Sequence, residues 1–185
     1  MKSQGITTKK LVLAGLLAAL TVVGSALRIT LPLSVAGTTS FHLGNIFCAL
    51  SGILLGPWLG GLAAGLGSAL YDILFYPAYI SECWITFLTK GAYAVAVGLV
   101  IGANWNYGKA MLATLTGAMT YAVLYLVKSY FWNGLLVSGL TPATAMVTVI
   151  EKLPATIFNI VVALVIAPLL AVSLRKALQK SHLSF

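Results

Sequence analysis

Charged side chains are scarce in this sequence, and several of them stand inside or beside long apolar stretches. Glu151 and Lys152 are adjacent within the apolar stretch 142–173, and the chain has only three acidic residues in all. A charge in hydrocarbon is costly and rarely faces lipid, so such groups normally belong to a site inside a helix bundle. The residues that predict this site are Asp72, Glu82, Lys90, Lys128, Glu151 and Lys152.

The composition predicts an integral membrane protein. Hydrophobic residues make up 60% of the 185 residues and charged residues 8%, and the mean hydropathy is +1.01. In a soluble domain about a quarter of the residues are charged. The formal charge of +8 does not indicate nucleic-acid binding, because the basic residues cluster at the ends of apolar stretches without interleaved aromatic residues.

Motifs for catalysis, metals and nucleotides are missing from the sequence. It has no GxxxxGK[ST] run, no HExxH and no GxSxG, so we expect no metal, no cofactor and no ATP binding by this chain alone. Cys48 and Cys83 lack the spacing of metal ligands, and their apolar surroundings predict buried free thiols.

Six stretches are apolar enough to predict an all-α bundle of six transmembrane helices in a single domain, 1–185, because a spanning helix needs about 20 mostly apolar residues. Gly56-Pro57 predicts a tight turn between the second and third helices. The last two stretches are longer than a perpendicular span, so they should tilt, kink or project. The predicted spans lie near 9–28, 42–57, 58–76, 82–102, 109–137 and 142–173.

The distribution of basic residues predicts that both termini are cytoplasmic. We expect the protein in the cell membrane. Arg28 is the one clear basic residue at the opposite ends of the spans. With a rise of about 1.5 Å per residue, this orientation places the charges inside the spans in the outer half of the bundle. The residues predicted on the cytoplasmic side are Lys2, Lys9, Lys10, Lys109, Arg175, Lys176 and Lys180.

Two segments near the amino end allow more than one interpretation. The first span resembles a secretory signal, but five apolar stretches and no soluble domain follow it, so we expect an uncleaved helix. Ala14 and Ala18 of this span lie four positions apart and form a smooth strip of small side chains, and the same spacing of small residues recurs one position on. Such a strip suits packing inside the bundle or against another membrane protein. The connection 29–41 is the longest external one, which favours a functional lid.

Polar and aromatic residues three or four positions apart form a stripe on one face of several predicted helices. Packing, an interfacial aromatic belt and paired charges that lock helices together also explain such stripes, but their concentration at one depth favours a binding site. The stripes comprise His42 and Asn45; Ser68, Tyr71, Asp72 and Phe75; Glu82, Thr86, Lys90 and Tyr93; Tyr121, Tyr125, Lys128 and Trp132; and Thr144, Thr148, Glu151 or Lys152, Ala155 and Asn159.

The run from His42 to Asp72 resembles the substrate-binding S component of energy-coupling factor (ECF) transporters. It contains His-Leu-Gly-Asn at 42–45, Leu-Leu-Gly-Pro-Trp-Leu-Gly-Gly at 54–61 and Gly-Leu-Gly-Ser-Ala-Leu-Tyr-Asp at 65–72, and Lys90-Gly91 follows later. The family pattern ends its first motif with Asp, whereas this chain has Asn45.

The resemblance implies capture of a water-soluble vitamin or vitamin precursor, together with a membrane-embedded coupling subunit and two cytosolic ATPases. It also implies that Ala14 and Ala18 dock on the coupling subunit and that the connection 29–41 closes over the substrate. The substrate itself stays open. The candidate substrate-binding residues are His42, Asn45, Asp72, Glu82, Trp84, Lys90, Tyr125, Lys128, Trp132, Glu151, Lys152 and Asn159.

Two other classes of function are compatible with buried charges. A self-sufficient channel or secondary transporter would use the carboxylates as a relay, but the inner half of every predicted span lacks ionisable groups. A membrane enzyme would use Glu82 or Glu151 as a base, but no nucleophile or metal set accompanies them. We therefore expect a transporter subunit and no enzyme.

Overall fold

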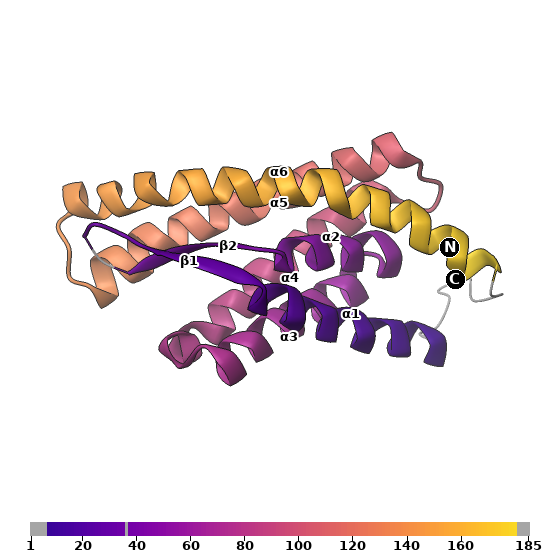
Figure 1. The fold of residues 1–185 in the computed structure, drawn as a ribbon, viewed down its shortest axis with the longest axis horizontal. Coiled ribbons are helices and arrows are strands. Elements are labelled where there is room, and N and C mark those ends of the chain that lie inside the picture. The colour runs from indigo at the N-terminus through magenta and orange to yellow at the C-terminus, as the bar shows by residue number, and fades with distance from the viewer. Residues whose placement is uncertain (1–6, 36, 181–185) are drawn as a thin grey trace.

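The computed structural model describes residues 7–35 and 37–180, apart from the side chain of Ala78. In this part of the chain, six α-helices pack around a common axis, and a two-stranded hairpin joins the first two (Figure 1). A 3₁₀ segment, Pro77–Glu82, leads into the fourth helix, and a π-helical segment, Ser129–Val137, extends the fifth. The elements are α1 Thr8–Ala26, β1 Arg28–Pro32, β2 Thr38–His42, α2 Gly44–Leu55, α3 Pro57–Phe75, α4 Cys83–Ile101, α5 Tyr107–Lys128 and α6 Pro142–Lys180.

The two ends of the bundle differ in what they carry. The start of α1, the end of α6 and the connection from α4 to α5 lie at one end, whereas the tip of the hairpin and the connection from α5 to α6 lie at the other (Figure 1). Most of the basic residues predicted to be cytoplasmic belong to elements that meet at the first end; Lys2 lies outside the described residues. We call the second end the hairpin end.

The helices confirm a multi-pass membrane fold. Five of them, α1, α3, α4, α5 and α6, are long and apolar enough to cross a membrane. The second predicted span, α2, has only 12 residues, which is short of the roughly 20 that a perpendicular span needs. Six spans therefore stay a prediction, although the helix bounds lie close to the predicted ones.

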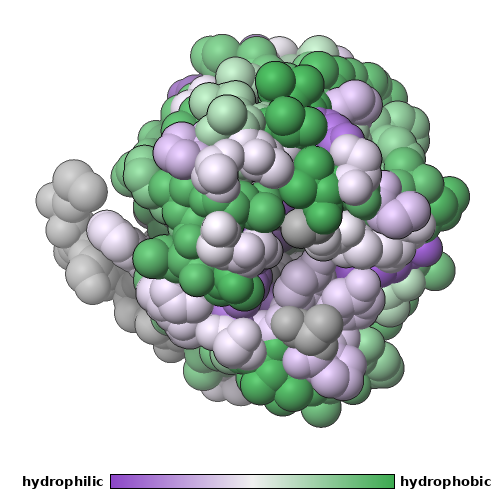
Figure 2. All heavy atoms as spheres, turned by 90° about the vertical axis from the view of Figure 1, so that its left-hand side faces the viewer, coloured by the Kyte–Doolittle hydropathy of each residue, from purple (hydrophilic) through white to green (hydrophobic). Residues whose placement is uncertain are grey.

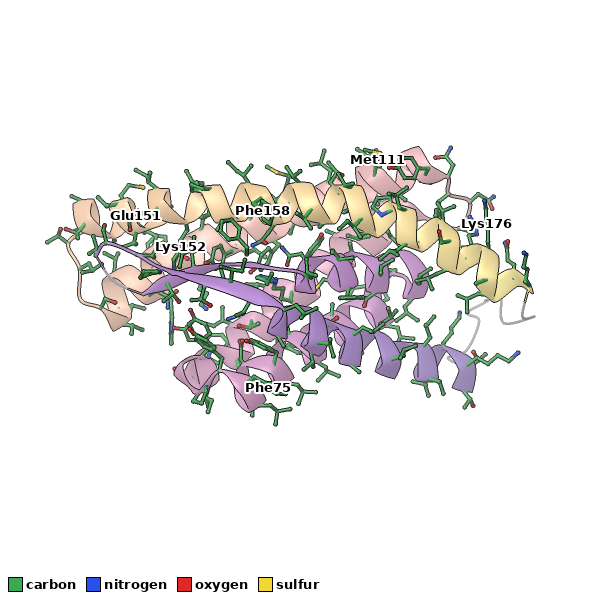
Figure 3. The ribbon with its side chains drawn as sticks, viewed as in Figure 1. Phe75, Met111, Glu151, Lys152, Phe158 and Lys176 are labelled. Atoms are coloured by element: carbon green, nitrogen blue, oxygen red, sulfur yellow. The ribbon has the colours of Figure 1, made fainter. Side chains whose placement is uncertain are left out.

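The surface of the bundle is apolar and its interior holds charge, the reverse of a soluble protein. Trp58 is 75% exposed and Leu136 71% exposed, whereas Asp72 and Lys90 are each 5% exposed. Figure 3 shows Phe75 on the outside of α3, where it is also exposed. Lipid can cover such a surface, and the buried charges must find partners or solvent inside the bundle.

The connection between α1 and α2 is a β-hairpin, which the sequence analysis, expecting a loop at 29–41, did not predict within this otherwise helical fold. Arg28 pairs with His42 and Pro32 with Thr38 in an antiparallel register. Residues 28–31 and 38–41 are rich in β-branched and apolar residues, which favour strands. Pro32 sits at the end of its strand, where its missing amide hydrogen costs no central ladder bond.

Glycines let α3 and α4 cross closely, as the small-residue spacing of Gly61 and Gly65 predicts. A Cβ on Gly61 would lie 2.7 Å from the Val95 side chain, and one on Gly65 would lie 2.8 Å from the carbonyl oxygen of Phe87. Gly56 adopts a φ of +78°, so it forms the predicted tight turn before the proline that opens α3.

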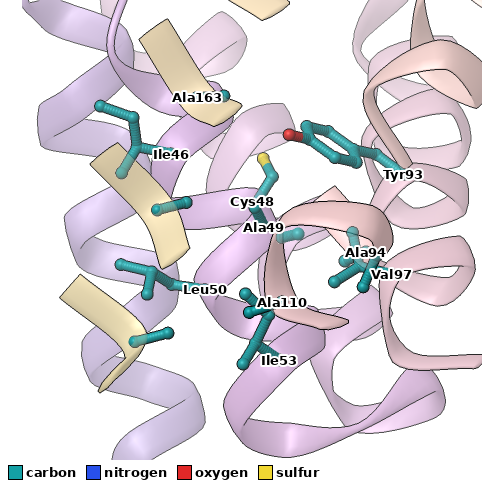
Figure 4. Close-up of a cluster of buried hydrophobic side chains, with 14 of the residues drawn as sticks. Ile46, Cys48, Ala49, Leu50, Ile53, Tyr93, Ala94, Val97, Ala110 and Ala163 are labelled. Carbon is teal, nitrogen blue, oxygen red and sulfur yellow. The ribbon is translucent and has the colours of Figure 1, made fainter. Parts of the chain in front are cut away.

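Apolar side chains fill the bundle on the side of the cavity away from the hairpin end. Figure 4 shows part of this core, in which Cys48 of α2 lies close to Tyr93 of α4. Cys48 and Cys83 are both free thiols, as expected, but only Cys48 is buried, whereas Cys83 is half-buried. The close packing of this region confines polar contents to the hairpin end.

Candidate functional site

A cavity of about 250 Å³ lies under the hairpin, between α2, α3, α4, α5 and α6. In the view onto the hairpin end, hydrophilic residues gather mostly around the hollowed middle of the molecule and hydrophobic residues around its edge (Figure 2). Ligand pockets in proteins are about 300–1,000 Å³, so this cavity approaches the size that a small molecule requires. Its walls carry both charged and aromatic side chains.

Lys90 of α4 lies deep in this cavity. Its ammonium donates a hydrogen bond to the Asn45 side-chain oxygen at the start of α2 and lies 3.8 Å from the centre of the Tyr121 ring. Both of these direct partners are neutral, so the contacts that hold the positive charge are an amide dipole and a cation–π interaction. The buried Nδ1 atom of His42, another cavity residue, has no hydrogen-bond partner among the residues that the structure describes.

Three tyrosines, one of α4 and two of α5, form a stacked row. The ring centres of Tyr93 and Tyr121 are 6.1 Å apart, and those of Tyr121 and Tyr125 are 5.7 Å apart. Lys152 of α6 lies 5.4 Å from the Tyr125 ring centre and donates a 3.0 Å hydrogen bond to the Ser129 hydroxyl. Tyr121 and Tyr125 therefore each contact one buried ammonium.

Glu82 and Lys128 form an ion pair between the start of α4 and the end of α5. Asn133 donates a 2.6 Å hydrogen bond to the other oxygen of the Glu82 carboxylate. Asn133 reaches the carboxylate because the chain from Ser129 to Val137 is a π-helix. The wider turn of a π-helix places Asn133, the fifth residue after Lys128, on the helix face that Trp132, the fourth, would occupy in an α-helix. The acid thus has partners on both oxygens.

Asp72 of α3 and Arg28 of β1 complete the charged wall. Asp72 is 5% exposed and makes no ion pair in the described part of the chain. The guanidinium of Arg28 lies 4.6 Å from the ring centre of Tyr71 and 5.1 Å from that of Tyr76. Stacking on aromatic faces is a common way to hold an arginine near a binding site.

The hairpin forms the roof of the cavity, and side chains of other elements hold it down. Asn159 of α6 accepts a 3.0 Å hydrogen bond from the His42 backbone amide and donates a 2.9 Å bond to the Ser40 carbonyl oxygen. The hydroxyls of Thr38 and Tyr79 are 3.0 Å apart. These contacts fasten both sides of β2 over the cavity.

Glu151 lies outside the cavity and holds the tip of the hairpin. Its carboxylate accepts a 3.1 Å hydrogen bond from the Ser34 backbone amide and a second bond from the Ser34 hydroxyl. Figure 3 shows Glu151 and Lys152 where α6 runs alongside the hairpin. Neighbouring residues of a helix point about 100° apart, so Lys152 faces the cavity while Glu151 faces the hairpin.

His42 is electrostatically neutral in this position. Burial, followed by the nearby positive charges of Lys90 and Arg28, holds the pKa of its imidazole well below its usual 6.5. A neutral imidazole has one donor and one acceptor nitrogen. His42 can therefore exchange a hydrogen bond with a ligand without adding charge to the cavity.

The structure brings most of the predicted site residues together. Those that line the cavity are His42, Asn45, Asp72, Glu82, Lys90, Tyr125, Lys128, Lys152 and Asn159. Trp84 is 53% exposed and packs edge-on against Trp132 outside the cavity, and Glu151 binds the hairpin. Sequence reasoning missed Arg28, Ser40, Tyr79 and Asn133 as site residues, because their placement depends on the hairpin, the 3₁₀ segment and the π-helix.

The smooth strip of α1 divides between two faces. Ala14 is buried and Ala18 half-buried, and a Cβ on Gly67 of α3 would overlap the Ala18 carbonyl oxygen. Gly15 and Ala19, one position on, are exposed, and nothing lies within 4 Å of a Cβ built on Gly15. Docking through Ala14 and Ala18 stays a prediction, with Gly15 and Ala19 as the exposed small residues beside them.

Comparison with known proteins points to one family. A family model described as ECF-type riboflavin transporter, S component, matches residues 5–176. A protein of Pyrococcus woesei, described as an uncharacterized protein in gap 3'region, is 35% identical over 116 residues, which covers 63% of this chain and 74% of that protein. No solved structure gives a significant match.

Proposed function

The chain belongs to the family of ECF-type riboflavin transporter S components, and on that premise we propose that it captures a water-soluble vitamin or vitamin precursor from outside the cell. Delivery inward then requires a membrane-embedded coupling subunit and two cytosolic ATPases. The description of the family names riboflavin, which makes riboflavin and its close derivatives the first molecules to test.

The observation that carries this proposal is the cavity under the hairpin. Charged and aromatic side chains converge on it from four helices, α3 to α6, and from the hairpin and the 3₁₀ segment, whereas the rest of the interior is an apolar core. The apolar core separates this polar pocket from the opposite end of the bundle. Such a pocket suits a protein that binds a solute and relies on partner subunits to release it on the other side. It does not suit a continuous channel, which would need polar groups along its length.

The hairpin acts as the lid of this pocket. Asn159 and Glu151 of α6 hold it through β2 and through its tip. Each of these hydrogen bonds is worth about 0.5–1.5 kcal/mol net, and the edge-on contact between the Phe41 and Phe158 rings adds a contribution of similar size. Opening the lid therefore costs little compared with unfolding, and a solute can enter from the hairpin end.

The orientation that this function requires places the hairpin end outside and both termini in the cytoplasm. Lys10, Lys109, Arg175 and Lys180 all belong to the opposite end, in agreement with the rule that basic residues concentrate on the cytoplasmic side. We propose six spans in the cell membrane, with α2 as a short span covered by its neighbours. Gly15 and Ala19 on the exposed face of α1 provide a smooth surface for a coupling subunit.

Reconstitution tests the function directly. The purified protein in liposomes should bind the solute without importing it, and ATP-driven import should appear only when the coupling subunit and ATPases are added. Lys90→Met should abolish both binding and import, whereas Lys109→Met at the far end should change neither. Import by the purified protein alone would instead identify an independent transporter and refute the proposal.

A further inference from the structure

The cavity carries more positive than negative charge. Four basic side chains, Arg28, Lys90, Lys128 and Lys152, line it together with two acidic ones, Asp72 and Glu82. The third acid of the chain, Glu151, is bound to the hairpin and does not line the cavity. The walls therefore hold a formal excess of two positive charges.

The protein itself compensates only part of this charge. Glu82 is taken up by its ion pair with Lys128. Asp72 forms no ion pair with any lysine or arginine in the described part of the chain. Even if Asp72 offsets one cation through space, two cations remain without an acid in a site surrounded by apolar helices.

Within the described residues, Lys90 and Lys152 are the two buried cations that line the cavity without an ion-pair partner. They are 5% and 6% exposed, and each donates one hydrogen bond, to the Asn45 amide oxygen and to the Ser129 hydroxyl. An ammonium has three donors, so both retain donors for a ligand. A buried charge without a counter-ion is costly, and a bound anion would remove that cost.

We propose that the captured molecule is a small organic anion, a carboxylate or a phosphate ester, whose oxyanion accepts hydrogen bonds from Lys90 and Lys152. This inference rests on the proposed function and narrows its substrate class. The two ammonium groups sit on adjacent tyrosines of α5, whose ring centres are 5.7 Å apart. An acidic group between them gains charge-assisted bonds that a neutral vitamin cannot form.

Pairs of molecules that differ in one acidic group test the inference. Equilibrium dialysis of the purified protein would compare pantothenate with neutral panthenol, and riboflavin 5′-phosphate with riboflavin, at low ionic strength. In any pair that binds, the anion should bind at least tenfold more tightly, because a hydrogen bond to a charged group contributes about 1.5–3 kcal/mol. Lys152→Gln should erase this preference, and Asp72→Asn should strengthen it.

Mass spectrometry of the small molecule released from the purified protein covers ligands outside this panel. A released compound that bears a carboxylate or phosphate supports the inference. A neutral or cationic compound, or a neutral panel member that binds as tightly as its anionic partner, overturns the inference and leaves the capture function intact. Failure of the folded protein to bind or retain any small molecule overturns the capture function and the inference together.

Discussion

Replacement of Asn159 by alanine tests whether the hairpin is a lid that opens separately from the bundle. The Asn159 side chain is 7% exposed and makes two hydrogen bonds to the β2 backbone, of 3.0 and 2.9 Å. At about 0.5–1.5 kcal/mol net for each bond, Asn159→Ala should favour the open lid by about 1–3 kcal/mol. That change corresponds to a roughly 5- to 150-fold larger open population.

Hydrogen exchange measured by mass spectrometry reads this population. Amides of residues 28–35 and 37–42 should exchange faster by about that factor, while peptides from the α4 core around Val97 keep the wild-type rate, because local opening leaves the core folded. Thr120→Ala is the matched control, since the Thr120 hydroxyl bonds only to a carbonyl of its own helix, at 2.9 Å. Unchanged exchange in the hairpin would refute the lid, and equal acceleration in hairpin and core would show global destabilisation instead.

Three further predictions follow from the described contacts. Glu82→Ala leaves Lys128 without its acid and should lower the stability of the protein by about 3–5 kcal/mol, measured as the midpoint of denaturation in detergent. The double variant with Lys128→Met should recover part of this loss. A Glu82→Ala protein as stable as the wild type would contradict the role of the ion pair. Gly98→Leu should prevent folding, because a Cβ at this position would overlap the backbone at the start of α3. The Gly15→Leu protein should instead elute as a folded monomer in size-exclusion chromatography and bind the ligand, but support less import together with the coupling subunit. Burial, and then nearby positive charges, lower the pKa of His42 in the folded protein. Below pH 6.5 the unfolded chain therefore takes up more protons than the folded one, so the stability of the protein should fall as the pH drops through that range. The variant His42→Asn should show a flatter dependence of stability on pH, and an equal loss in both proteins would exclude His42 as its source.

The sequence was sufficient to predict the membrane class, the approximate helix bounds and most of the cavity wall. Burial of charge follows from the cost of ions in hydrocarbon, and helical spacing identified the inward faces of α4 and α5. The residues Asp72, Lys90 and Lys128 therefore lie in the cavity as expected. The spacing of Gly61 and Gly65 likewise predicted a close crossing of two helices.

The parts that escaped prediction depend on departures from regular helical geometry. Helical spacing assigned Trp132 to the site, but the π-helix shifts the register by one residue and brings Asn133 to Glu82. Spacing also left Glu151 and Lys152 as alternatives, and packing against the hairpin separated their roles. The hairpin itself is too short for a strong sequence pattern, so the position of Arg28 beside the cavity could not be foreseen.

The roof of the cavity is a paired ribbon rather than a slack loop. Five residue pairs from Arg28–His42 to Pro32–Thr38 are already in register, and ordering a free residue costs about 1–2 kcal/mol of backbone entropy. The hairpin can then close over the cavity as a rigid body that rotates about the ends of its strands, so that few backbone torsion angles become restricted on closure. Capture by such a preorganised flap should have a small entropic penalty, and the affinity should be governed by how well the walls match the chemistry of the solute.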